Sequence, residues 1–191
     1  MERDGMQVEA TKKLFTVEEY YQMAEAGILK PQDRVELIEG EIIQMSPIGV
    51  RHAACVNRAT DLFTFSFRGR AIVTVQNPVR LNRYNEAQPD LVLAKHRADY
   101  YASGHPTPED VFLMLEVAQT TLRYDRDVKL PIYARLGIRE VWIENLKHDV
   151  ILVFRNPVGE KFRDSLTLHR GDSLSAAAFP EITFKVEDLL G

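Results

Sequence analysis

The chain has 191 residues, 45% hydrophobic and 27% charged, which is enough to enclose a full core, so we expect a single domain over residues 1–191. Its net charge of −4 excludes bulk attraction to polyanions, and the lone Cys55 excludes an internal disulfide. No apolar run approaches the ~20 residues that span a bilayer, and the first residues lack a signal-peptide pattern. These properties are typical of a soluble cytoplasmic protein.

The first predicted element is a helix over residues 16–27, preceded by a flexible N-terminus over residues 1–13. Thr16 can cap this helix, and Glu19, three residues later, completes a capping box. Gly27 provides the stop.

Residues 34–45 predict two strands joined at Gly40. Glu36 lies between Val35 and Leu37, so its side chain is on the opposite strand face from theirs. It therefore either contacts solvent or points into a cleft.

A second helix is predicted over residues 50–67, where apolar side chains recur at helical spacing. His52 falls in its first turn, where a hydrogen-bonded structural histidine is favoured over a functional one. The β-branched residues 71–75 predict a strand, and residues 78–81 are expected to continue it beyond a break at Pro78.

Two acidic residues interrupt the apolar strands that follow. Within residues 88–94 we predict an apolar strand whose first residue is Asp90, and we predict a loop over residues 95–110. Residues 111–118 are apolar almost throughout, which predicts a strand buried on both faces with Glu116 near its end.

The next helix carries Lys129 and Tyr133 and stops at Gly137. Because Pro131 lacks a backbone donor, this helix should begin just before Lys129 or bend there. Strands are predicted over residues 140–143 and 150–154, and edge strands with a short terminal helix over residues 157–191. The order of elements predicts an α/β fold with a central mixed β-sheet flanked by helices.

Asp90 and Glu116 are the candidate metal ligands, because both are expected at the ends of neighbouring core strands. A carboxylate there is costly unless a cation, hydrogen bonds or water compensate its charge. Carboxylate oxygens suit Mg²⁺ or Mn²⁺, and such an ion would activate water and neutralise charge on a phosphoryl oxygen. The sequence thus predicts a Mg²⁺ (or Mn²⁺) site at these two residues.

Lys129 is the candidate third catalytic group, since an ammonium could orient the water or donate to a phosphate. Asp125, Lys129 and Tyr133 recur every four residues and so share one helix face. Residues 47–139 carry thirteen basic and nine acidic side chains, a positive surplus that would attract a polyanionic substrate.

A family resemblance is carried by the ordered motifs ELIEGE at residues 36–41, QPD at 88–90, LEV at 115–117 and GIREVW at 137–142, together with Ser46-Pro47, His52, Tyr124-Asp125, Lys129 and Tyr133. With them the chain resembles the PD-(D/E)XK superfamily of restriction-endonuclease-like nucleases and, more closely, the Uma family of endonucleases, over about residues 14–156. The resemblance implies a restriction-endonuclease-like core, Mg²⁺-dependent hydrolysis of DNA and, by analogy, a homodimer.

The superfamily pattern has a lysine two residues after the glutamate, and this chain has Ala118 there. The resemblance implies that Lys129 replaces it. Possible additional site residues are Glu36, Tyr133 and His52. Arg123 and Arg126 are expected to contact phosphates or to be surface charges.

Two other functions remain open at this point. A nonenzymatic nucleic-acid-binding or assembly domain would keep the fold without the activity, and Ala118 favours it. A carboxylate-pair hydrolase acting on a small substrate would need no positive groove.

Overall fold

The computed structural model describes residues 11–30 and 32–191. Most of the predicted flexible segment 1–13 lies outside the described residues. Among the residues described, no helix combines the length and the apolar character needed to cross a membrane.

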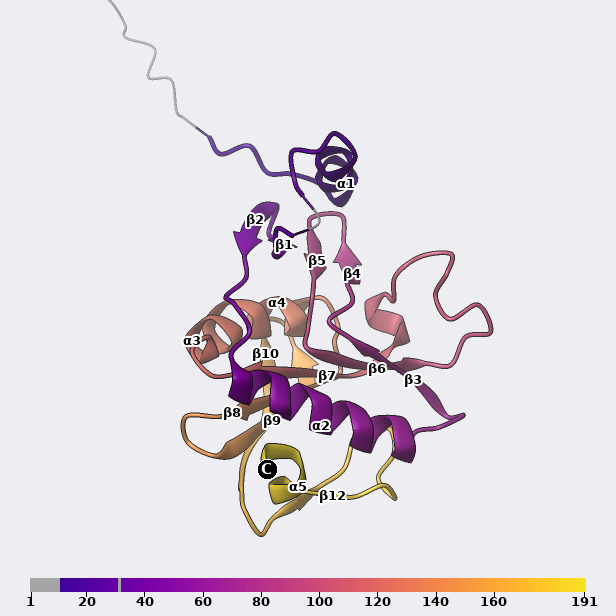
Figure 1. Ribbon diagram of the computed structural model, residues 1–191, viewed down its shortest axis with the longest axis vertical. Helices are drawn as coiled ribbons and strands as arrows, with labels where there is room; N and C mark the ends of the chain where they lie inside the picture. The colour runs from indigo at the N-terminus through magenta and orange to yellow at the C-terminus, as the bar shows by residue number, and fades with distance from the viewer. Residues whose placement is uncertain (1–10, 31) are drawn as a thin grey trace, which may run out of the picture.

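A six-stranded sheet with the order β10-β9-β8-β7-β6-β3 forms the centre of the molecule (Figure 1). Only β7 and β8 run parallel, and the other neighbours are antiparallel, so the predicted mixed sheet is confirmed. In sheet order the strands are β10 (Lys161–His169), β9 (Val150–Val158), β8 (Glu140–Asn145), β7 (Val111–Ala118), β6 (Leu91–Lys95) and β3 (Ala71–Val75).

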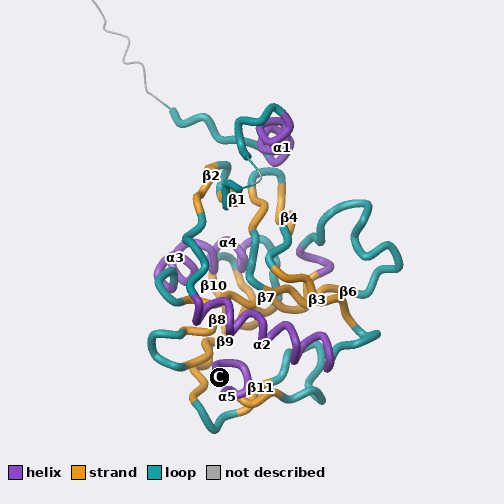
Figure 2. Tube along the Cα trace, viewed as in Figure 1, coloured by secondary structure: helices purple, strands orange, loops and turns teal. Residues whose placement is uncertain are grey.

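Helices cover both faces of this sheet, as predicted (Figures 1 and 2). One face packs against α2 (Val50–Ser66) and α5 (Val186–Leu190), and the other against α4 (Leu130–Arg135). Strand β7 contributes to both cores, because Leu115 faces α2 whereas Met114 faces α4. The apolar run 111–118 is therefore buried on both sides.

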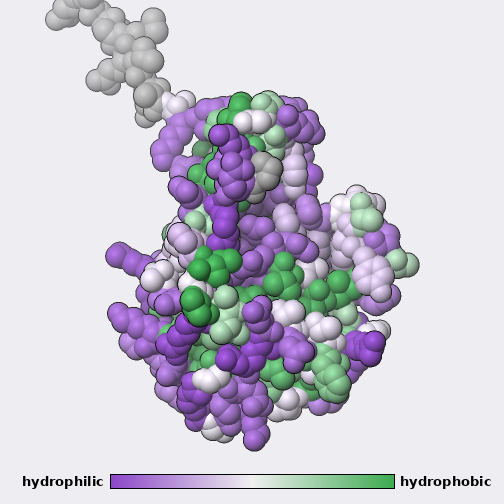
Figure 3. All heavy atoms as spheres, in the orientation of Figure 1, coloured by the Kyte–Doolittle hydropathy of each residue, from purple (hydrophilic) through white to green (hydrophobic). Residues whose placement is uncertain are grey.

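A second sheet with the order β2-β1-β5-β4 lies beside the first, with α1 (Val17–Glu25) next to it (Figure 1). The capping box predicted for Thr16 and Glu19 is present. On the face shown in Figure 3, the molecule narrows between the two sheets and apolar side chains gather at this waist. The strands are β1 (Val35–Ile38), β2 (Glu41–Gln44), β4 (Val79–Asn82) and β5 (Asn85–Ala87).

The prediction that residues 78–81 continue the strand 71–75 is wrong. Gln76 adopts a φ of 51°, which turns the chain out of the large sheet before Pro78. The segment after the proline pairs with β5 in the second sheet, and β5 itself was missed.

The helix expected to begin just before Lys129, or to bend there, instead begins seven residues earlier, at Leu122. A short α3 (Leu122–Tyr124) leads into the π-helical turn η2 (Asp125–Lys129) and then into α4. Pro131 cannot donate to the carbonyl four residues before it, and its ring crowds that group. The π turn includes Asp127, whose carbonyl is the one affected.

Three short elements complete the described chain. They are the 3₁₀ turn η1 (Pro108–Asp110) and the strand pair β11 (Ser173–Leu174) and β12 (Phe184–Lys185).

Candidate active site

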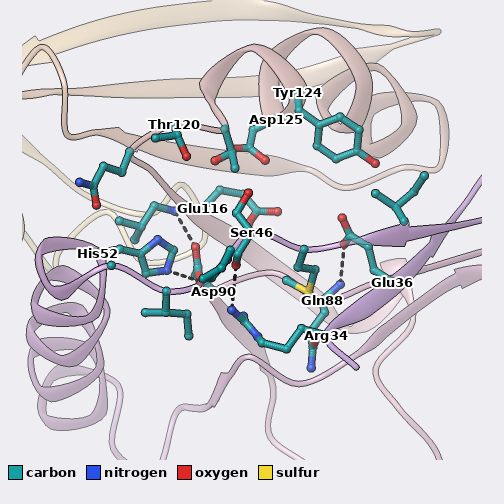
Figure 4. Close-up of a pocket in the computed structure, with 18 of the residues that line it drawn as sticks. Arg34, Glu36, Ser46, His52, Gln88, Asp90, Glu116, Thr120, Tyr124 and Asp125 are labelled. Carbon is teal, nitrogen blue, oxygen red and sulfur yellow. Dashed lines mark hydrogen bonds and ion pairs between the residues drawn. The ribbon is translucent and has the colours of Figure 1, made fainter. Parts of the chain in front are cut away.

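A cavity of about 480 Å³ opens where the two sheets meet, and its walls come from both of them. Figure 4 shows Glu36 entering from the second sheet, Asp90 and Glu116 from the large sheet, and Asp125 from the helical segment opposite. Four acids line the cavity, and Arg34 and Lys129 are its only lysine or arginine residues among those described. The pocket is therefore acidic, although the middle of the sequence is basic.

Asp90, 7% exposed, lies immediately before β6. Its Oδ2 accepts a hydrogen bond from the Val117 backbone N–H at 2.9 Å, and its Oδ1 lies 2.8 Å from His52 Nε2 and 3.1 Å from Gln76 Nε2. Burial alone would raise the pKa of Asp90, but the contact with His52 and the two other donors bring it below its usual value. Asp90 is thus held ionised and rigid.

Glu116, 5% exposed, is in β7 beside the Val117 amide that holds Asp90. Its Oε1 lies 2.8 Å from Lys129 Nζ and accepts a hydrogen bond from the Tyr133 hydroxyl at 2.7 Å. Burial raises the pKa of Glu116 to about 8 against the attraction of Lys129. Within the described chain no side chain or amide donates to Oε2, which lines the pocket.

Glu36 points into the cleft and not into solvent, with 4% of its surface exposed. Its Oε2 accepts a hydrogen bond from the Gln88 backbone N–H at 3.1 Å and lies 3.3 Å from Lys129 Nζ. The prediction had left both orientations open, and burial decides between them.

Lys129 is 3% exposed, and its ammonium lies between Glu116 and Glu36. Burial lowers its pKa, yet the two carboxylates raise it well above the usual value, so the side chain stays charged. No residue next to Glu116 in its strand is positively charged, and Lys129 supplies that charge from the helical segment. Ala118, where the superfamily has its lysine, is buried in the core that faces α4.

The predicted shared face of Asp125, Lys129 and Tyr133 is present, although the segment is not a regular α-helix. Asp125, 6% exposed, lines the pocket, and burial raises its pKa despite the nearby Lys129. Tyr133, 1% exposed, donates a hydrogen bond from its hydroxyl to Glu116 Oε1.

Arg123 and Arg126 do not line the pocket. The Arg123 side chain is 95% exposed, and both arginines pair with Asp127 on the outer surface of the helical segment. A contact with phosphate remains a prediction for them.

Several site residues were missed from the sequence. Gln76 and Gln88 hold Asp90 and Glu36. Gln88 belongs to the QPD motif but was given no role in the site, and Gln76 carries no pattern that would single it out. Tyr124 lines the pocket, but regular helical spacing places it away from Lys129. Their positions depend on the turn at Gln76 and on the π turn.

The donor chemistry of the site fits a hard divalent cation. Mg²⁺ is commonly bound by one or two carboxylates, with water completing its coordination. Asp90 and Glu116 supply two carboxylates in an acidic pocket, and Oε2 of Glu116 is not engaged by a side chain or amide. Across residues 11–30 and 32–191, no group of three or more His, Cys, Asp or Glu side chains is arranged to hold a metal, so at most two such side chains would bind the ion directly.

The model of a family named Uma2 and described as "Putative restriction endonuclease" matches residues 17–187, which extends beyond the range 14–156 at its C-terminal end. No curated protein matches the chain. A crystal structure of a "putative nuclease belonging to DUF820" from Anabaena variabilis superposes with a TM-score of 0.70 and 14% identity, over 92% of this chain and 97% of that one. At this identity the similarity shows a shared fold.

Proposed function

The chain belongs to the Uma2 family of restriction-endonuclease-type proteins, and from this premise we propose that it is a Mg²⁺-dependent endonuclease that hydrolyses phosphodiester bonds in DNA. The observation that carries the proposal is the distance of 2.8 Å between Lys129 Nζ and Glu116 Oε1. It joins an acid on β7 to a lysine from a separate helix, beside a second acid, Asp90, in one pocket. An acid pair can hold a divalent ion, and a lysine beside it can stabilise charge that develops on a phosphoryl oxygen during hydrolysis.

In this proposal Asp90 and Glu116 would hold the ion, and Glu36, which pairs with Lys129, would not be a direct ligand. The bound ion would supply neutralisation of charge on the phosphoryl oxygens and activation of water. His52 and Gln76 position Asp90 through their contacts with Oδ1. Tyr133 positions Glu116 through its hydroxyl.

Lys129 has two roles here. Its charge offsets the cost of burying Glu116 and Glu36, which would otherwise repel each other and the substrate. When a phosphate enters, its ammonium can donate to an oxygen on which negative charge develops. The acidic pocket cannot attract DNA by itself, so substrate binding should also depend on the ion.

A nonenzymatic nucleic-acid-binding or assembly domain is the second candidate. Ala118 at the superfamily's lysine position favours it. This candidate binds DNA or a protein partner without hydrolysis. A homodimer, inferred by analogy, is compatible with either candidate function. Light scattering on the protein as it elutes from a sizing column measures the oligomeric state.

Nicking of supercoiled plasmid separates the two candidates. We expect wild-type protein to nick the plasmid with Mg²⁺ and not with EDTA, and Asp90→Asn and Glu116→Gln to abolish nicking because each removes one carboxyl group that would bind the ion. Asp61→Asn, an exposed acid on α2 outside the pocket, is the matched control and should retain the wild-type rate. Plasmid that stays intact with wild-type protein and Mg²⁺ would favour the binding or assembly domain.

A further inference from the structure

The hydroxyl of Tyr124 is a buried donor that has no hydrogen-bond partner among the described residues. Buried hydroxyls are nearly always paired, so an unpaired one calls for a ligand, a water molecule or a functional role. Tyr124 lines the same cavity as Asp90 and Glu116, and it extends from the helical segment opposite them (Figure 4).

The π turn explains why this tyrosine lies in the pocket. Tyr124 and Lys129 are five residues apart, and in a regular α-helix such residues point about 140° away from each other. In a π-helix the hydrogen bonds join residues i and i+5, as the bond from the Leu130 N–H to the Asp125 carbonyl does here. Over this turn Tyr124 comes onto the same side as Lys129, and both line the cavity.

The surroundings of Tyr124 keep its hydroxyl protonated. Burial, together with the negative charge of Glu36, raises the pKa of Tyr124 to about 12 against the opposing effect of Lys129. The phenol is therefore a neutral donor at neutral pH. Lys129 is already in contact with two carboxylates, whereas the Tyr124 hydroxyl has no partner among the described residues.

We propose that Tyr124 is a further catalytic residue whose O–H donates a hydrogen bond to a non-bridging oxygen of the scissile phosphate. The proposal rests on the proposed nuclease function. An anionic phosphate oxygen is a stronger acceptor than a neutral group, and it becomes stronger still as charge develops during hydrolysis. The phenol keeps its proton throughout, so it stabilises charge and is neither the general acid nor the nucleophile.

The test compares Tyr124→Phe, which removes only the hydroxyl, with Tyr101→Phe. Tyr101 is a matched control because its hydroxyl donates to the Lys95 carbonyl at 2.9 Å, at the opposite end of β6 from Asp90. Two quantities are measured on one oligonucleotide: kcat with Mg²⁺, and affinity with Ca²⁺ in place of Mg²⁺. Denaturant unfolding of each variant shows whether the fold is kept.

We expect Tyr124→Phe to lower kcat by about 10²-fold, the usual effect of losing one donor to a developing oxyanion. Its affinity for the oligonucleotide should fall by about 3–10-fold, the value of one ordinary hydrogen bond. Tyr101→Phe should change neither quantity. An unchanged kcat and affinity in Tyr124→Phe, or an equal loss in Tyr101→Phe, would overturn the assignment.

The failure of the nuclease proposal is distinguishable from the failure of this one. If wild-type protein binds the oligonucleotide without cleaving it, the nuclease function is lost but the affinity comparison still applies. A 3–10-fold weaker affinity in Tyr124→Phe alone would support the phosphate contact, and equal affinities would overturn it.

Discussion

Glu140 and Glu144 lie four residues apart on one strand, β8, but their carboxyl groups differ in hydrogen bonding. Glu140, 1% exposed, accepts hydrogen bonds from Trp142 Nε1, from Arg155 and from the Ala177 backbone N–H, between 2.6 and 2.7 Å. Glu144 is fully buried, and neither of its oxygens has a hydrogen-bond partner among the described residues. Burial raises the pKa of Glu144 well above its usual value despite the attraction of Arg58.

Glu144 should therefore make stability depend on pH. The folded protein retains a proton that the unfolded chain releases above its ordinary pKa of 4.5, so the free energy of unfolding falls as the pH rises from there. Glu144→Gln removes this titration, and we expect it to be more stable than wild type at about pH 8 but not at about pH 4.

Denaturant unfolding followed by the fluorescence of the single tryptophan, Trp142, measures this difference. Glu140→Gln is the contrasting variant, because it weakens three existing hydrogen bonds and should lose stability at both pH values. A Glu144→Gln curve that coincides with wild type at about pH 8 would show that the carboxyl group is ionised and satisfied in the fold.

Lys129 should matter for both stability and cleavage. Lys129→Ala leaves Glu116 and Glu36 buried without their cation, and breaking such a pair costs about 3–5 kcal/mol of the free energy of unfolding. We expect plasmid nicking to fall by about 10²–10³-fold, since a donor to the phosphate is lost. Lys129→Arg should restore part of the rate, because its guanidinium keeps the charge but is bulkier and cannot give up its proton. Wild-type nicking by Lys129→Ala would remove the lysine from the mechanism.

At this scale the sequence was sufficient for residues with a distinctive chemistry. An acid at the end of a buried strand needs compensation wherever it occurs, so Asp90 and Glu116 could be singled out, and the family resemblance added Lys129. Gln88 and Tyr124 belong to the motifs of the resemblance but were given no role in the site, and Gln76 was not singled out, because their place in the site follows from backbone turns and not from local composition.

Among the elements, those defined by strong periodicity were predicted well, and those defined by a change of direction were not. The apolar spacing of residues 50–67 and the run 111–118 correspond to α2 and β7. The left-handed backbone at Gln76 and the π turn before Pro131 moved β4 to another sheet and the start of the third helical segment to Leu122. Both features depend on how neighbouring segments pack, which local propensity does not encode.

The β1–β2 hairpin depends on Gly40, whose φ is +74°. An added Cβ there would lie 2.7 Å from Leu14 Cβ, so Gly40→Ala would shift the hairpin that carries Glu36. Gly27 is a matched control, because its φ is +72° but an added Cβ would meet nothing within 4 Å.

We expect Gly27→Ala to cost about 1–2 kcal/mol of stability from the left-handed backbone alone, and to leave nicking unchanged. Gly40→Ala should cost more than this and should also reduce nicking, because Glu36 moves relative to Lys129. The two variants are compared by denaturant unfolding and plasmid nicking. Equal losses of stability with full nicking would mean that the hairpin does not position the site.

Across the whole molecule, the site lies at the junction of two sheets and an irregular helical segment. The predicted mixed sheet flanked by helices is present, but the second sheet as a separate wall of the pocket was not foreseen, since it forms from short strands distant in the sequence. This junction gathers four acids and Lys129, from four segments of the chain, around one cavity. The rigidity of both sheets therefore fixes the distances on which catalysis would depend.

Because this cavity is acidic, we expect Asp90 and Glu116 to hold a divalent ion there, beside Lys129. Crystals soaked in Mn²⁺ test it most directly, because the anomalous signal of the metal locates it without reference to activity. We predict one peak between the carboxylates of Asp90 and Glu116 in wild-type protein and no peak there in Glu116→Gln. A wild-type map without a peak at this position, with Lys129 still paired to Glu116 and Glu36, would contradict the account and leave the pocket as an ion-pair cluster of a binding or assembly domain.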